Sequence, residues 1–279
     1  EVLLDTTVQE KNITFPTDTK QQVKIIKKCR EIALREQIQL RQSYKRKVKE
    51  HLLNQRFKKH AKNRKKASAS ARKIKTIAGR LVRELEKKLN AERLKAYQEE
   101  LALFKRVLGQ KKESTHKIYS LHEKDVLCIS KGKDHKKYEF GSKASFGVTK
   151  NSGIIVSVLD VRNQYDGHTV PMAIEQIQKT TGQTPQAVIC DRGYAGKKEV
   201  LGVKVHIPRP GKKLSAYEKT KIRKMFRRRA SIEPIIGHMK AEHGLDKCYL
   251  KDIRGDEINL LMAAAAFNLR KYMRKTRIR

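Results

Sequence analysis

The sequence predicts an α/β fold in which a mixed sheet is flanked by helices, and a long basic helical insertion interrupts the chain after the first strand. Three observations support this. Short apolar runs occur at the start of the chain and again between residues 138 and 207, and segments with helical periodicity follow them. Residues 20–113 contain 31 Lys and Arg against 9 Glu, with no Asp or Pro. Strands that alternate with helices are typical of a sheet covered by helices.

The whole chain is strongly basic. Its 279 residues include 66 Lys and Arg but only 29 Asp and Glu, a formal net charge of +37. Such a charge opposes compaction unless a polyanion relieves it, and nucleic acid is the natural partner. The sequence has no long apolar run, lipidation motif or signal peptide, so we expect a cytoplasmic protein that binds no membrane. Its four cysteines are scattered, which argues against a disulfide framework or a zinc module.

The first predicted strand ends in an acid. Residues 2–4 are apolar, Asp5 follows them, and residues 8–12 form a polar stretch. We therefore expect a short buried strand with a carboxylate at its carboxyl end, where ligands bind in open α/β sheets. An aspartate at a strand end is also common turn chemistry. Because the chain begins with this strand and without an initiator Met, we expect a further segment to precede it.

Residues 20–113 are predicted to be helical. Segments 21–53 and 71–108 combine good helix formers with apolar residues spaced three and four apart, whereas the link at 56–70 is too basic to contribute much core. We interpret the insertion as a helical hairpin that binds DNA; a solvated charged coiled coil without a ligand is the alternative. The chain is thus divided into residues 1–19, the insertion at 20–113, and residues 114–279.

The last part has the pattern of a folded α/β region. Residues 138–149 and 154–161 predict strands joined as a hairpin by the turn at 150–153. Thr169 is placed to cap a helix that ends at Gly182. Residues 187–190 predict a buried strand that ends in Asp191, and residues 203–207 predict the next strand. Residues 256–274 predict an apolar helix with one side formed by Ile258, Leu261, Ala265, Leu269 and Tyr272.

A third acid lies on a predicted helix in the C-terminal part of the chain. Glu233 and Lys240 are seven residues apart and therefore share a helix face. Pro234 is tolerated if this helix begins near Ser231, whereas a helix that begins earlier would kink. Only the longer helix brings Arg229 to Glu233. Taken alone, this pair is typical of a basic surface helix. The apolar residues that predict packing on an adjoining face are Ile232, Ile235, Ile236 and Met239.

Asp5, Asp191 and Glu233 come from separate elements, and we expect them to converge at one edge of the sheet. Three crowded carboxylates repel one another and require cations. Oxygen ligands suit Mg²⁺, with Mn²⁺ as a substitute, and two such ions about 3.5–4 Å apart support in-line displacement at phosphorus. Basic side chains nearby would neutralise and position a DNA phosphate. The candidates for this DNA-binding role are Arg229, Lys240, Lys143 and Arg192.

These features resemble bacterial insertion-sequence transposases of the DDE class, whose ribonuclease-H-like catalytic domain is interrupted by an insertion. The signature of that group, Y-x2-R-x3-E-x6-K, appears here as Phe226, Arg229, Glu233 and Lys240, with its spacing preserved and Phe in place of Tyr. The resemblance extends to the segment VICDRGYAG around Asp191 and to the segments YEFGSK, YDGHT and AAAAFNLRK. It therefore covers essentially the whole chain.

The resemblance implies that Asp5, Asp191 and Glu233 are catalytic acids that bind Mg²⁺. It implies an enzyme that cleaves transposon ends and joins their 3′-hydroxyl to target DNA, acting as a homo-oligomer on double-stranded DNA. Two departures from the family pattern are the missing hydroxyl at Phe226 and the missing N-terminal helical region, which suggests a fragment or a decayed copy. The rival hypotheses are a non-enzymatic DNA-binding remnant and a nuclease that hydrolyses DNA without joining it.

Overall fold

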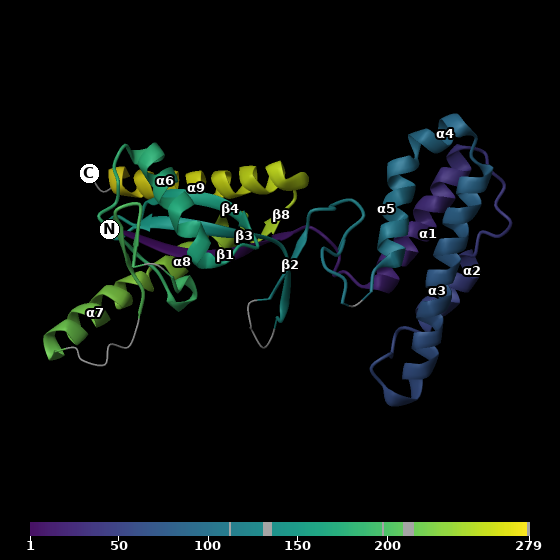
Figure 1. The fold of residues 1–279 in the computed structure, drawn as a ribbon, viewed down its shortest axis with the longest axis horizontal. Helices are drawn as coiled ribbons and strands as arrows, with labels where there is room; N and C mark the ends of the chain where they lie inside the picture. The colour runs from purple at the N-terminus through teal and green to yellow at the C-terminus, as the bar shows by residue number, and fades with distance from the viewer. Residues whose placement is uncertain (112, 131–135, 197, 209–214, 278–279) are drawn as a thin grey trace. The chain divides into compact units, whose positions relative to one another are not determined.

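A computed structural model describes residues 1–111, 113–130, 136–196, 198–208 and 215–277 (Figure 1). The chain divides into two compact units, one of residues 1–12 and 125–279, and the other of residues 13–124. The first unit contains a sheet with helices on it, and the second is helical. The helical stretch follows the first strand, so the α/β fold and its interruption are as predicted.

The first unit is built on a mixed sheet that has eight strands within the described residues. Its main path is β2-β3-β1-β5-β7-β6, with β4 paired to β3 and β8 paired to β1. β1 is antiparallel to β3 and parallel to β5, and β5 is parallel to β7. This arrangement is consistent with a ribonuclease-H-like fold. The strands are β1 (Val2–Lys11), β2 (Leu127–Ser130), β3 (Tyr138–Thr149), β4 (Ile155–Arg162), β5 (Ala187–Ile189), β6 (Glu199–Val200), β7 (Val203–His206) and β8 (Lys247–Cys248).

Alternation along β1 places a helical layer on each face of the sheet. Leu3 packs in one core with residues of α8 and α9, whereas Val2 and Leu4 pack in another with residues of α6. In Figure 1, α9 runs alongside the strands. The helical elements of this unit are η1 (Asp166–Thr169), α6 (Val170–Thr181), η2 (Arg192–Tyr194), α7 (Ala216–Arg229), α8 (Ile232–Glu242) and α9 (Asp252–Arg277).

The predicted strand hairpin and the helix after it are confirmed, with one correction. β3 and β4 pair antiparallel, and Gly153 in their turn has a φ of 62°. α6 ends at Gly182 with a φ of 69°, a left-handed conformation that glycine adopts at little cost. Thr169 precedes α6 as predicted but does not cap it with its side chain. Its hydroxyl instead donates to the backbone carbonyl of Asp166 at 2.7 Å, because η1 occupies the preceding turn.

β1 is longer than predicted, and Asp5 lies within it rather than at its end. Residues 6–10 continue the strand because they pair with β3, for example Val8 with Lys143 and Glu10 with Gly141, and Lys11 pairs with Cys248 of β8. Pairing compensates for their polar composition. On the other side, β5 pairs only with Val2 and Leu3. Asp5 is therefore the first acidic position of β1 beyond its pairing with β5.

The second unit has its own core, and its helices are α1 (Asp18–Arg35), α2 (Lys45–Leu53), α3 (Ala61–Lys88), α4 (Ala91–Ala96) and α5 (Gln98–Gly109). The predicted two-helix hairpin is therefore divided further. As predicted, residues 56–70 contribute little to this core: none of them belongs to it, although the segment is helical from Ala61 and its Ala67 and Ser70 are buried in α3. They lie against the turn that follows α2, where the Asn54 amide donates to the Ser70 hydroxyl and the Gln55 amide donates to the Ala67 carbonyl.

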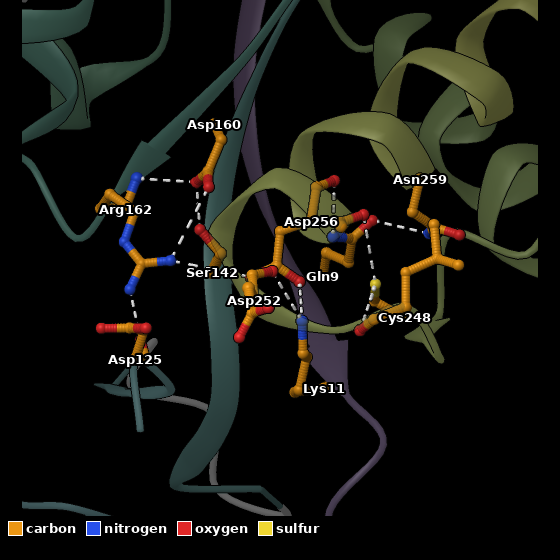
Figure 2. Close-up of polar contacts among 12 residues, drawn as sticks. Gln9, Lys11, Asp125, Ser142, Asp160, Arg162, Cys248, Asp252, Asp256 and Asn259 are labelled. Atoms are coloured by element: carbon orange, nitrogen blue, oxygen red, sulfur yellow. Dashed lines mark hydrogen bonds and ion pairs between the residues drawn. The ribbon is translucent and has the colours of Figure 1, made fainter. Parts of the chain in front are cut away.

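A buried ionic network lies at the carboxyl end of β1 (Figure 2). The Lys11 ammonium is 2.8 Å from the Asp256 carboxylate and 3.0 Å from the Asp252 carbonyl. Arg162 lies 3.8 Å from Asp160 and 3.7 Å from Asp256. Burial raises the pKa of Asp256, and the Lys11 ammonium opposes that shift. Two cations thus face two carboxylates, and only the Arg162 side chain among the four is partly exposed, at 26%.

Candidate active site

Asp5 faces the layer formed by α8 and α9, because it alternates along β1 with Leu3. Its carboxylate accepts a hydrogen bond from the Thr6 backbone N–H at 2.8 Å and from Arg229 Nη2 at 3.0 Å. The side chain is only 14% exposed. An acid this enclosed needs a cationic partner, and α7 supplies one.

Asp191 follows β5 and is held by the start of η2. Its Oδ1 accepts a hydrogen bond from the Gly193 backbone N–H at 2.7 Å, which orients the carboxylate. A Cβ on Gly193 would lie 3.0 Å from Asp191 Oδ1 and 3.2 Å from Asp166 Oδ2. Glycine at this position therefore lets two carboxylates approach the same turn.

Glu233 lies in the first turn of α8, with Pro234 directly after it. α7 ends at Arg229, so the structure has two helices rather than one kinked helix. Ala230 and Ser231 nevertheless keep right-handed helical backbone angles across the junction. Arg229 Nη1 consequently reaches Glu233 Oε1 at 3.8 Å, although the sequence prediction required a continuous helix for this approach. As predicted, Ile232, Ile236 and Met239 are buried.

One guanidinium joins the three acids. Arg229 is 3.0 Å from Asp5, 3.9 Å from Asp191 and 3.8 Å from Glu233. All four residues line a cavity of about 700 Å³. Within the described residues, no three His, Cys, Asp or Glu side chains are grouped closely enough to hold a metal ion. Arg229 supplies a positive charge among these acids.

A fourth carboxylate, Asp166, lines the same cavity, and the sequence analysis did not identify it. Its Oδ1 accepts from the Thr6 hydroxyl and from Lys143 Nζ, each at 3.1 Å. In the sequence, Asp166 could have been found as an acid in the YDGHT segment, four residues after the end of β4. It was missed because turn aspartates are common. With Asp166, four carboxylates line the cavity. The cations that contact them, among the residues described above, are Arg229 and Lys143.

The four predicted DNA-binding residues have different positions. Arg229 and Lys143 line the cavity, and the Lys143 side chain is only 12% exposed. Arg192 is exposed on η2, directly after Asp191. Lys240 is partly buried two turns along α8 from Glu233, and it is not among the described residues that line the cavity.

Phe226, at the position of the signature tyrosine, is partly buried. It lies on α7, one turn before Arg229, and packs against the core that contains Leu3 and Ile232. The ring therefore helps to dock the end of α7 on the sheet. This packing role does not require a hydroxyl.

The sequence profile of the transposase DDE domain family matches residues 122–269, more than half of the chain. The chain belongs to this family. Asp191 and Glu233 lie within the matched residues, whereas Asp5 lies before them. No curated protein and no solved structure gave a significant match.

The family match identifies the chain as a transposase with a DDE domain. Domains of this family are typically catalytic, act on DNA and generally use divalent metal ions. The donors present suit such ions, because the cavity is lined by carboxylate oxygens that already surround a cationic group. Among the described residues, none of the helices is long and apolar enough to cross a lipid bilayer.

Proposed function

We propose that this transposase cleaves DNA at transposon ends and joins the resulting 3′-hydroxyl to target DNA, with Asp5, Asp191 and Glu233 as its catalytic acids. The proposal rests on one observation: acids from β1, from the end of β5 and from α8 all face the same guanidinium. These three acids are far apart in the sequence but meet at one cation. Chemistry at a charged phosphate requires such a preorganised group of charges.

The same three carboxylates would hold Mg²⁺, or Mn²⁺ in its place. Bound ions of this kind activate the attacking hydroxyl or water and stabilise the leaving oxygen at phosphorus. In the proposed reaction, Asp191 keeps its orientation through the Gly193 N–H, and Asp5 through the Thr6 N–H. Arg229 leaves the three acids and binds a DNA phosphate instead, because its planar guanidinium can donate two hydrogen bonds to one phosphate.

We place the chain with the insertion-sequence transposases that carry the Y-x2-R-x3-E-x6-K signature, here Phe226, Arg229, Glu233 and Lys240. Lys240, Lys143 and Arg192 would contact the DNA backbone around the site. For this, the Lys143 ammonium would have to leave Asp166 or contact Asp166 and a phosphate at the same time. We also propose that the protein works as a homo-oligomer on double-stranded DNA, since joining two ends requires two cleavage events.

Residues 20–113 are proposed to form a separate DNA-binding insertion between residues 1–19 and 114–279. The exposed side of α3 carries Lys65, Lys66 and Lys73, while Ile74 and Leu81 form the core on its other side. Such an arrangement gives a row of cations on a rigid helix, suited to phosphate contacts.

The test of the catalytic proposal is cleavage of labelled plasmid and short duplex DNA with Mg²⁺, Mn²⁺ or EDTA. The parent should cut only with metal, and Asp191→Ala and Glu233→Ala should abolish cutting. The matched control is Asp246→Ala, an exposed acid outside the cavity, which should cut like the parent. Strand-transfer products separate a transposase from a nuclease. DNA binding without cutting, unchanged by either substitution, would favour the inactive remnant.

The DNA-binding role of the insertion is tested by replacing Lys65, Lys66 and Lys73 with Gln. Each lost phosphate contact lowers the salt slope of log K by about 0.9. Binding should therefore weaken and its salt dependence flatten, while the melting temperature stays the same. An unchanged slope would contradict the proposed role of α3.

A further inference from the structure

α9 is apolar on two opposite sides, and only one of them is covered. Leu260, Ala263 and Ala264 are buried against the sheet. At 100° per residue, the opposite side contains Met262 and Leu269, which are 65% and 60% exposed. A surface helix normally has one apolar side and one polar side. The predicted apolar side of this helix is therefore real, but it faces away from the sheet.

The exposed side has the spacing of a helix-pairing seam. Its residues are separated alternately by four and three positions, the repeat that lets two helices pack side by side. Ile258 and Tyr272, at its ends, are 42% and 65% exposed, and Leu261 and Met273 extend it at the edges. A continuous apolar stripe of this kind marks an interaction surface. The residues of this α9 seam are Ile258, Met262, Ala265, Leu269 and Tyr272.

The centre of the α9 seam suits pairing with a second copy of itself in an antiparallel orientation. Ala265, in the middle, is small enough to let two helices approach closely. With the two-fold axis at Ala265, Ile258 lies level with Tyr272 of the second copy, and Leu261 lies level with its Leu269. These two pairs are apolar on both sides and occur twice, as the symmetry of an isologous interface requires, whereas Met262 lies level with Asn268 of the second copy.

The charges along α9 favour the same orientation. The exposed Glu257 in its N-terminal part and Lys275 in its C-terminal part lie on the same edge of the seam, although the exposed Arg254 adds a positive charge to the N-terminal part. Antiparallel pairing places Glu257 of each copy near Lys275 of the other. Parallel pairing would place like charges together. Antiparallel packing also sets the two helix dipoles in opposite directions.

We propose that α9 is the dimer interface of this protein, formed by two α9 seams packed antiparallel around Ala265. Side chains of this size and exposure offer on the order of 600 Å² per copy, or about 1,200 Å² in total, the lower limit of a standard interface. The net charge of +37 opposes this association. Dimerisation should therefore strengthen as salt rises, which is the opposite of DNA binding.

Sedimentation equilibrium of the full chain without DNA or metal tests the interface, at about 0.5 M salt where charge repulsion is largely screened. The parent should dimerise. Leu269→Gln should raise the dissociation constant at least about tenfold without lowering the melting temperature. The control is Leu34→Gln, since Leu34 is 83% exposed on α1; it should dimerise like the parent. A monomeric parent at every concentration, or an unaffected Leu269→Gln, would overturn the proposal.

Cysteine cross-linking tests the orientation. Leu261→Cys and Leu269→Cys, mixed and oxidised, should form a mixed disulfide dimer, while neither should cross-link to itself. Self-cross-linking of each variant would show parallel pairing and overturn the antiparallel interface. The oxidised parent is the control, because Cys29, Cys190 and Cys248 are buried and Cys128 is partly buried. The interface rests on the homo-oligomer of the proposed function, but these measurements use neither DNA nor catalysis, so their failure would leave the proposed cleavage chemistry untouched.

Discussion

Two ionic clusters are built on the same strand, six residues apart, and they differ in burial and in charge balance. Around Asp5, the carboxylates among the described residues outnumber the cations, and Glu233 is 64% exposed. Around Lys11, two cations face two carboxylates, and the Lys11 side chain is only 2% exposed. Among the described residues, the first cluster has more carboxylates than cations and one acid that is open to solvent. The second cluster is balanced, and its Lys11–Asp256 pair is closed to solvent.

The difference separates a site that can bind from a site that holds the fold together. An excess of carboxylates is costly in a folded protein unless a ligand compensates for it. A balanced buried network has no such need, and removing one partner leaves a charge without compensation. Substitutions in the first cluster should therefore affect activity, and those in the second should affect stability.

The largest expected effect is on catalysis in the Asp5 cluster. Asp191→Asn or Glu233→Gln should lower the rate of cleavage at least about a thousandfold, because each removes a charge worth several kcal/mol in the transition state. The melting temperature without metal should remain within a few degrees of the parent. If either variant unfolds instead, the carboxylate is part of the fold and the comparison fails.

The next effect is on stability in the Lys11 cluster. Lys11→Met alone should lower the unfolding free energy by about 3 kcal/mol, since it leaves the buried Asp256 carboxylate with less compensation. Adding Asp256→Leu should recover much of that loss, because an apolar pair pays no desolvation. Urea unfolding of both single variants and the double variant measures the coupling. Additive losses would mean that the two residues act separately.

A smaller effect is expected where Gly193 lets two carboxylates approach the same turn. Gly193→Ala places a methyl group against Asp191 and Asp166, and the carboxylates must shift by a few tenths of an ångström. Cleavage should fall roughly tenfold to a hundredfold with little loss of stability. Gly196→Ala is the control, because a Cβ there meets its nearest atom only at 3.7 Å. Equal effects of the two substitutions would show that crowding is not the cause.

The smallest effect is a change in pH dependence. Burial raises the folded pKa of Asp256 above its ordinary value of 3.8. Its contribution to stability is therefore complete below pH 3.8 and is lost as pH rises through the folded pKa. Asp256→Asn lacks this titration, so its stability deficit should shrink as pH rises through that window. A deficit that grows with pH would mean that Lys11 outweighs burial.

Local patterns predicted most of the elements of the α/β unit. Alternation and turn residues located β3, β4 and the end of α6 at Gly182, because these depend on neighbours in the chain. The spacing of Arg229 and Glu233 predicted their approach only for a continuous helix, whereas the structure achieves it across a two-residue junction between α7 and α8. The length of β1 could not be predicted, since its polar half is stabilised by pairing with β3.

The sequence by itself determined the basic character of the chain, the α/β class with its helical insertion, and the three acids proposed for catalysis. Only the tertiary structure placed Arg229 among those acids, added Asp166 to the cavity, and buried Lys11 with Asp256. It also decided which apolar side of α9 is covered by the sheet. The physical reason is that periodicity reports which residues share a face. Which face is buried depends on strand register and layer packing between residues far apart in the chain.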